Sequence, residues 1–200
     1  EAHAPGRQGL QLRRVRLGGR GGAPLALGVV RTGIAALGCS CTQAYGRTEA
    51  APWLTALTKE EDLVDAPQIA SAGRPIVGVE VKVCREDGSL CDVDEVGEVV
   101  ARGPNMMQGY WRKPEETKAA LRDGWYWSGD MARRDEGGYI YIVDRSKDMI
   151  ISGGENISST EVEAAIYAHP AVLEAAVIGI PHEQWGETVH AVVVLKADTS

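Results

Sequence analysis

Residues 97–111 read G-E-V-V-A-R-G-P-N-M-M-Q-G-Y-W. The first five predict a short strand, and the glycines and proline that follow predict a turn. This pattern of short strands and turns continues outward on both sides, with strands expected at 79–83 and 139–143 and a turn at 86–89. We therefore expect a β-rich region, shaped like a small distorted barrel, over residues 73–143.

The flanking sequence alternates between extended and helical patterns. Toward the N-terminus we expect a strand at 12–17, a helix at 25–37 closed by Gly38, a strand at 39–44 and an irregular polar stretch at 52–72. Toward the C-terminus we expect helices at 114–121 and 158–168 and strands at 149–151, 172–180 and 189–195. The elements from residue 145 onward fit a small α+β domain.

The composition limits the classes of function. The 200 residues suggest one or two domains, and 44% apolar and 24% charged residues are ordinary for a globular protein. A net charge of −7 argues against nucleic acid as a partner, although a nucleotide needs only a few local donors. No apolar run approaches the roughly 20 residues that span a bilayer. The four cysteines, at 39, 41, 84 and 91, form no CxxC pair, so we expect reduced thiols and a cytoplasmic protein.

Four glycine-marked segments follow one another along the chain. They are G-G-A-P at 21–24, Q-A-Y-G-R-T-E at 43–49, W-S-G-D at 127–130 and D-R-S-K-D-M-I-I-S-G-G-E-N at 144–156. Each alone is more often a polar turn than a ligand site. In this order, and together with residues 97–111, they resemble the adenylate-forming superfamily, which includes acyl- and aryl-CoA synthetases, luciferases and nonribosomal peptide adenylation domains. The resemblance extends from about residue 12 to the end.

The resemblance implies a reaction in two halves. A carboxylate attacks the α-phosphate of ATP, which gives acyl-AMP and pyrophosphate, and the small domain then rotates so that a thiol displaces AMP. ATP, Mg²⁺ and coenzyme A are the expected cofactors and co-substrates, and a small-molecule carboxylic acid is the expected partner. The acyl group implied is a fatty acid of short to medium chain. An adenylation domain that loads a carrier protein, or a non-catalytic nucleotide-binding remnant, are the alternatives.

The resemblance also assigns roles to residues. Thr48 would bind a phosphate oxygen and Glu49 would coordinate Mg²⁺, so these two are the catalytic candidates. Asp130 would accept both ribose hydroxyls, because one carboxylate can serve a vicinal diol. Tyr45 would stack on adenine. The full set of nucleotide-binding candidates is Gly22, Ala23, Pro24, Gln43, Ala44, Tyr45, Gly46, Arg47, Thr48, Asp130 and Arg145.

Plainer structural interpretations remain open for several of these residues. Tyr45 could be a core aromatic, the Thr48 region a helix N-cap, and Asp130 an ordinary turn residue. Arg145 could form a surface ion pair with Asp144 or Asp148. Two departures from the family pattern also stand out: Ala44 replaces a common glycine, and Arg47 replaces a residue that is often Met or small. Arg47 could meet a phosphate or face solvent.

The implied fold is α/β, with a remnant of the large adenylate-forming domain over 1–144 followed by the start of the small C-terminal domain over 145–200. Lys147 would be the hinge between them, and Gly153, Gly154 and Glu155 would line the coenzyme A channel. Two elements of the family pattern are absent, namely the phosphate loop and the terminal catalytic lysine, since Lys196 comes too early. We therefore expect these residues alone to be catalytically incompetent. The sequence does not predict an oligomeric state.

Overall fold

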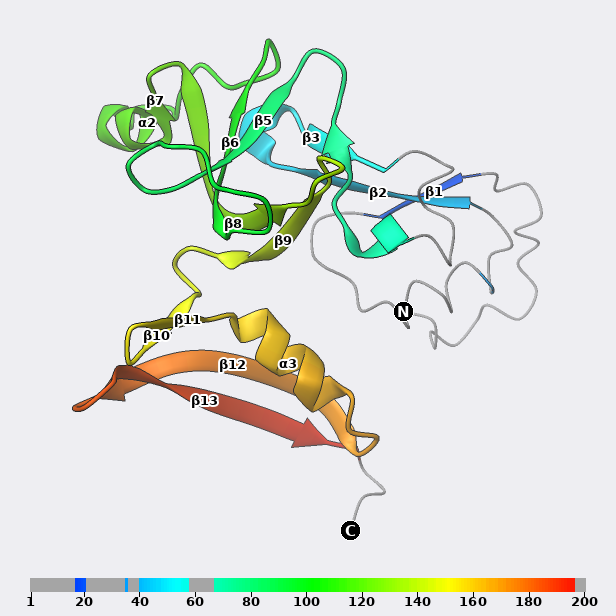
Figure 1. Ribbon diagram of the computed structural model, residues 1–200, viewed down its shortest axis with the longest axis vertical. Helices are drawn as coiled ribbons and strands as arrows, with labels where there is room; N and C mark the ends of the chain where they lie inside the picture. Colours follow the sequence, from blue (N-terminus) through cyan, green and yellow to red (C-terminus); the bar gives the residue numbers. More distant parts are fainter. Residues whose placement is uncertain (1–16, 21–34, 36–39, 58–66, 197–200) are drawn as a thin grey trace.

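The computed structural model describes residues 17–20, 35, 40–57 and 67–196. Figure 1 shows two lobes, which we call the large lobe (residues 17–145) and the small lobe (residues 150–196). A short connection joins them after strand β9. The expected strand at 12–17 and helix at 25–37 lie outside the described residues, apart from Leu17 and Ala35. Within the described residues, no helix has the length and apolarity needed to cross a bilayer.

The large lobe contains two sheets. The first has the order β1-β2-β3-β4, in which β1 and β2 are parallel and the other pairs are antiparallel. Its strands are β1 (Leu17–Arg20), β2 (Ser40–Gly46), β3 (Trp53–Ala56) and β4 (Arg74–Pro75), with one-turn 3₁₀ helices η2 (Thr48–Ala50) and η3 (Pro67–Ala70) nearby. Strand β3 corrects our expectation of an irregular stretch at 52–72. Its residues Leu54 and Thr55 are fully buried.

The second sheet is antiparallel and forms the expected β-rich region. Its order is β5-β6-β8-β7, and β9 pairs with residues 130–134 of β8. The strands are β5 (Glu80–Cys84), β6 (Gly97–Arg102), β7 (Leu121–Arg122), β8 (Trp125–Arg134) and β9 (Ile140–Arg145), with helix α2 (Pro114–Ala120) before β7. The predicted strands at 79–83, 97–101 and 139–143 and the helix at 114–121 are thus confirmed within one or two residues.

Strand β8 overturns our interpretation of residues 127–130 as a loop. The segment lies in the middle of the ten-residue β8, where Tyr126, Ser128 and Asp130 alternate onto the buried face. Gly129 has a φ of 73°, and the register against β6 shifts beside it, so the strand bulges here. Glycine, serine and aspartate are depleted in strands, which explains why the sequence suggests a turn.

Two packed clusters stabilise the large lobe. One joins the second sheet through Val83, Cys91, Val99, Ala132 and Ile140. The other joins η2 and β3 to the second sheet through Ala50, Leu54, Val79 and Ala101. The ring of Tyr45 packs against both clusters and so lies where the two sheets meet. Cys84 and Cys91 are free and buried, while the other two cysteines are not described in their side chains.

The small lobe is a four-stranded antiparallel sheet of order β11-β10-β13-β12 with one helix against it. Its elements are β10 (Ile150–Ser152), β11 (Glu155–Ile157), α3 (Ser159–Tyr167), β12 (Val172–His182) and β13 (Gly186–Leu195). Ser158 caps α3, and its Oγ accepts a hydrogen bond from the backbone N–H of Glu161. All four elements predicted from 149 onward are therefore confirmed. The division into domains at residues 144 and 145 remains a prediction.

Candidate functional site

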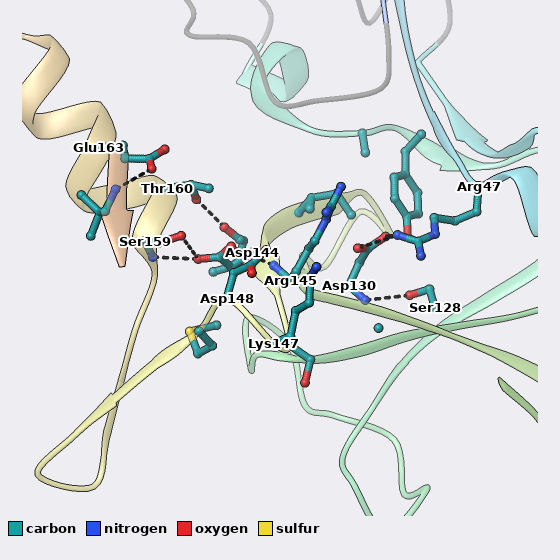
Figure 2. A pocket seen from close by; sticks show the side chains of 18 of the residues that line it. Arg47, Ser128, Asp130, Asp144, Arg145, Lys147, Asp148, Ser159, Thr160 and Glu163 are labelled. Atoms are coloured by element: carbon teal, nitrogen blue, oxygen red, sulfur yellow. Dashed lines mark hydrogen bonds and ion pairs between the residues drawn. The ribbon is translucent and has the colours of Figure 1, made fainter. Parts of the chain in front are cut away.

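A cleft of about 1320 Å³ lies between the two lobes. We call it the interlobe cleft, and Figure 2 shows part of its lining. The large lobe contributes residues 43–49 and 128–130, the connection contributes residues 144–149, and the small lobe contributes residues from α3 and β12. The cleft thus brings together residues 43–49 and 128–130, two motifs that lie far apart in the sequence.

Asp130 is held rigidly at the wall of this cleft. Its side chain is only 7% exposed, which is unusual for an aspartate and requires partners. Its backbone N–H donates to Ser128 Oγ at 3.1 Å, and that hydroxyl donates to the carbonyl of Val99 at 2.8 Å. The backbone of the bulge therefore fixes the direction of the carboxylate, and Asp130 is not an ordinary turn residue.

The carboxylate of Asp130 accepts hydrogen bonds from two residues of the 43–49 segment. Tyr45 donates its hydroxyl to Oδ2 at 2.7 Å, and Arg47 Nη1 lies 3.1 Å from Oδ1 and 3.3 Å from Oδ2 (Figure 2). Burial, and then the Asp130 charge, raises the pKa of Tyr45 well above its ordinary value. Burial opposes the charge of Arg47, but Asp130, Tyr126 and Glu49 together outweigh it and raise the pKa of Arg47. Arg47 is therefore partly exposed but paired with a carboxylate of the protein.

Glu49 lies on the other side of Arg47. Its Oε1 accepts the hydroxyl of Tyr110 at 2.8 Å, and its Oε2 is 3.8 Å from Arg47 Nε. Burial disfavours the charged form, but hydrogen bonds from its own backbone N–H and from Tyr110, with the Arg47 charge, hold the pKa of Glu49 below its ordinary value. Thr48, between these residues, is exposed at the cleft. Sequence reasoning missed Tyr110, because nothing near residue 110 links it to residue 49.

Glu49 fits the chemistry of a magnesium ligand. It is an ionised carboxylate at the cleft, and Mg²⁺ is commonly held by one or two carboxylates together with substrate phosphates and waters. Among the described residues there is no cluster of three or more metal-ligating side chains. A magnesium ion here would therefore depend on oxygen ligands from a phosphate as well as on Glu49.

The turn before Arg47 brings two strands unusually close. A Cβ on Gly46 would lie 1.7 Å from the carbonyl oxygen of Pro52, so only glycine fits at this position. Ala44 is buried in β2. No described residue donates to the buried Oε1 of Gln43, which also lines the cleft and is thus an available acceptor. The remaining nucleotide-binding candidates, Gly22, Ala23 and Pro24, lie outside the described residues.

Two cations line the cleft near Asp130: Arg145 is the residue of β9 that pairs with Asp130 of β8, and Lys147 follows in the connection. Arg145 and Lys147 are both exposed, and Figure 2 shows them between the Asp130 side and the α3 side. In the described part of the chain, no carboxylate pairs with either side chain, so the alternative ion pair of Arg145 with Asp144 or Asp148 is not formed there. Both cations are available to an anionic ligand.

Asp144 fastens the small lobe to the end of β9. Its Oδ2 accepts the backbone N–H of Ser159 at 2.7 Å and the Ser159 hydroxyl at 2.8 Å, and its Oδ1 accepts the N–H of Arg145 at 2.8 Å (Figure 2). The hydroxyl of Thr160 donates to the carbonyl of Val143 at 2.7 Å. We call these contacts the α3 clamp. It satisfies donors at the first turn of a helix, which prefers a negative charge there.

The glycines expected in the coenzyme A channel form a hairpin turn in the small lobe. Gly153 and Gly154 connect β10 to β11 with φ values of 60° and 89°, and a Cβ on Gly153 would lie 2.8 Å from the Trp185 ring. Neither they nor Glu155 line the interlobe cleft. The structure thus gathers the proposed nucleotide and hinge residues that it describes into one cleft, and keeps 153–155 apart from it.

Comparison with known proteins gives matches along most of the chain. Residues 2–111 match the family model of the AMP-binding enzyme, and residues 161–200 match that of the AMP-binding enzyme C-terminal domain. A feruloyl-CoA synthase from Amycolatopsis is 48% identical over 157 residues, which are 78% of this chain and 31% of that protein. A long-chain-fatty-acid–CoA ligase from Bacillus subtilis is 40% identical over 195 residues, which are 97% of this chain and 34% of that protein.

A solved structure agrees with the fold. The o-succinylbenzoate CoA synthetase from Bacillus subtilis, in complex with its acyl-adenylate intermediate, superposes with a TM-score of 0.84 at 36% identity. The match covers 93% of this chain and 37% of that one. The chain therefore spans about a third of the length of the relatives it matches.

Proposed function

The chain belongs to the family of AMP-binding enzymes, and on this premise we propose that it serves the ATP-dependent ligation of a carboxylic acid to coenzyme A. The relatives and the solved structure described above are CoA synthetases or CoA ligases by name. In the proposed reaction the carboxylate attacks the α-phosphate of ATP and pyrophosphate leaves. The thiol of coenzyme A then attacks the acyl carbon of the acyl-AMP, and AMP leaves.

The observation that carries this proposal is the buried carboxylate of Asp130, which faces a cleft that also holds unpaired cations. Asp130 would accept the two ribose hydroxyls, because a carboxylate with a fixed direction matches a vicinal diol. Arg145, which pairs with Asp130 across β8 and β9, and Lys147 would contact ribose and phosphate oxygens. Nucleotide binding by this cleft is thus supported by geometry as well as by family membership.

The 43–49 segment would hold the rest of the nucleotide. We propose that Thr48 binds a phosphate oxygen and that Glu49 binds Mg²⁺, which when bound neutralises phosphate charge and favours attack at the α-phosphorus. The exposure of Thr48 and the lowered pKa of Glu49 support these roles. The Tyr45 ring would still offer a face to adenine, although its hydroxyl is engaged by Asp130 and its ring packs against both cores.

The acyl substrate and the second half-reaction are the finer parts of the proposal. We propose a fatty acid of short to medium chain, on the resemblance of residues 153–163 and 185–188 to such enzymes. The relatives are named for an aromatic acid and for long-chain fatty acids. Lys147 would be the hinge, and rotation there would bring Gly153, Gly154 and Glu155 toward the coenzyme A arm. We also propose a cytoplasmic location.

Calorimetric titration of the chain with AMP and Mg-ATP tests the nucleotide site. We expect saturable binding, and we expect Asp130→Asn to weaken it by about 1.5–3 kcal/mol, the range for hydrogen bonds to a charged group. Asp123→Asn is the matched control, because Asp123 is exposed in the turn between β7 and β8 and does not line the cleft. Equal affinities in both variants would exclude the ribose role of Asp130.

A further inference from the structure

The carboxylate proposed to bind ribose already has protein partners on both of its oxygens. Tyr45 donates to Oδ2, and Arg47 Nη1 reaches both Oδ1 and Oδ2. A ribose diol that engaged both oxygens would have to take the position of the guanidinium nitrogen. Oδ2 already accepts two hydrogen bonds, so ribose binding through both oxygens competes with the contact of Arg47 to both of them.

The way in which Arg47 contacts Asp130 favours its exchange. A single nitrogen serves both carboxylate oxygens at 3.1 and 3.3 Å, whereas the strongest arginine pairs use two nitrogens in parallel. The Arg47 side chain is also 29% exposed, and its Nε is 3.8 Å from Glu49, on the side of Thr48. The guanidinium can therefore leave Asp130 without crossing the core and still remain at the cleft.

Loss of this ion pair would have a cost that depends on the ligand. Asp130 is nearly buried, so its charge needs a replacement partner, and ribose hydroxyls supply hydrogen bonds but no positive charge. The displaced Arg47 in turn needs an anion, and a phosphate group beside the ribose would provide one with oxygens suited to a guanidinium. An uncharged nucleoside would satisfy Asp130 and leave Arg47 with only its longer, 3.8 Å contact to Glu49.

We infer that Arg47 is a displaceable counter-ion of Asp130 that makes the cleft select phosphorylated nucleosides over uncharged ones. The inference rests on the proposed function, because it assumes that Asp130 binds ribose. Arg47 lowers the affinity for every ligand that needs Asp130, and it returns affinity only to a ligand whose phosphate it can contact. It is thus a specificity-determining residue of the nucleotide site.

Titration of the full chain with adenosine, AMP and ATP tests this role. We expect Arg47→Met to bind adenosine about tenfold more tightly, because removal of a competing contact restores the fraction of binding-competent carboxylate. For AMP and ATP the same gain is offset by the loss of a charge-assisted contact to phosphate, so the affinity of the variant for these two ligands should be unchanged or lower. The ratio of the adenosine to the AMP dissociation constant is the quantity to compare.

Two further variants separate this role from a structural one. Arg102→Met makes the same chemical change in an exposed ion pair with Glu80 that is not part of the cleft, and should leave the ratio unchanged. Arg47→Lys keeps the charge without the guanidinium and should give an intermediate ratio, and it tests the inference if Arg47→Met does not fold. Circular dichroism shows which variants fold.

The outcomes distinguish the inference from the function on which it rests. If the unsubstituted chain binds none of the three ligands, the proposed function fails and the role of Arg47 fails with it. A second outcome is that nucleotides bind, that Asp130→Asn lowers their affinity, and that both Arg47 variants keep the original ratio of dissociation constants. In that case the nucleotide site is supported and only the role of Arg47 is refuted. Equal weakening of all three ligands also refutes it, because a structural role predicts no change in preference.

Discussion

The α3 clamp makes Asp144→Asn the most informative single substitution in the connection between the lobes. The carboxylate is 6% exposed and accepts three hydrogen bonds at 2.7–2.8 Å, two from Ser159 and one from the backbone of Arg145. Asparagine keeps the size and one acceptor oxygen, but its NH₂ group must face one of these donors. Hydrogen bonds to a charged group contribute about 1.5–3 kcal/mol each. We therefore expect the free energy of unfolding of the small lobe to fall by about 2–4 kcal/mol, since the remaining oxygen retains part of the network.

Urea denaturation with amide hydrogen exchange measures this effect. Exchange should accelerate for the first-turn amides of α3, including Ser159 and Glu161, whereas amides of the second sheet should be nearly unchanged. Asp148→Asn is the control. It removes the same charge from an exposed side chain that lies four residues after Asp144. It should change stability by no more than about 0.5 kcal/mol. If the two variants have equal stability and equal α3 exchange, the clamp does not fasten the small lobe and the reasoning is wrong.

Three other predictions each test a single feature of the structure. Gly46→Ala should destabilise the large lobe by about 1–3 kcal/mol, because its Cβ would lie 1.7 Å from the Pro52 carbonyl, and a urea midpoint equal to that of the unsubstituted chain would contradict this. Burial and then the bond to Glu49 raise the pKa of Tyr110 from 10.0 to about 12, so its contribution to stability is full below about pH 10 and declines as pH rises to about 12. The titration of Tyr110 can be isolated by subtracting the ultraviolet titration curve of Tyr110→Phe. The pKa of Tyr110 should be lower in Glu49→Gln, and an unchanged pKa would show that Glu49 is not the partner of Tyr110. Gly153→Ala should lower the midpoint of thermal unfolding more than Gly154→Ala does. Both glycines have a positive φ, but only a Cβ on Gly153 would contact the Trp185 ring. Equal midpoints would show that the ring moves to accommodate the added carbon.

The fold was largely predictable where side chains alternate between apolar and polar. The strand at 79–83 has this pattern, whereas those at 97–101 and 172–180 are short, mostly apolar runs, and each appears within two residues of its expected position. Strand β8 was not predictable in the same way, because its central residues favour turns in isolation. Its extended conformation is imposed by pairing with β6 on one side and β9 on the other, which is tertiary information.

The candidate site shows the same division. Family resemblance singled out residues 43–49, 130, 145 and 147, and the structure places them around one cleft, whereas their chemical roles remain proposals. The partner of Arg47 could not be predicted, because Asp130 is 83 positions away and the contact depends on how the two sheets pack. The clamp was hidden for a similar reason: the sequence indicates a capped helix at Ser158, but not that Asp144 supplies the charge at its first turn.

The β12–β13 hairpin has a consequence for the order in which the chain acquires structure. These strands pair from Val172↔Leu195 to His182↔Gly186 across a turn of only three residues, so their contacts close short loops. The pair formed by Arg47 and Asp130 requires the closure of a far longer loop, and contacts of that kind form late. We therefore expect the small lobe to form during refolding before Asp130 meets its partners. A chain that stopped at this stage would have a folded small lobe and an unassembled nucleotide site. Its far-ultraviolet circular dichroism would then suggest more nucleotide binding than the chain could support.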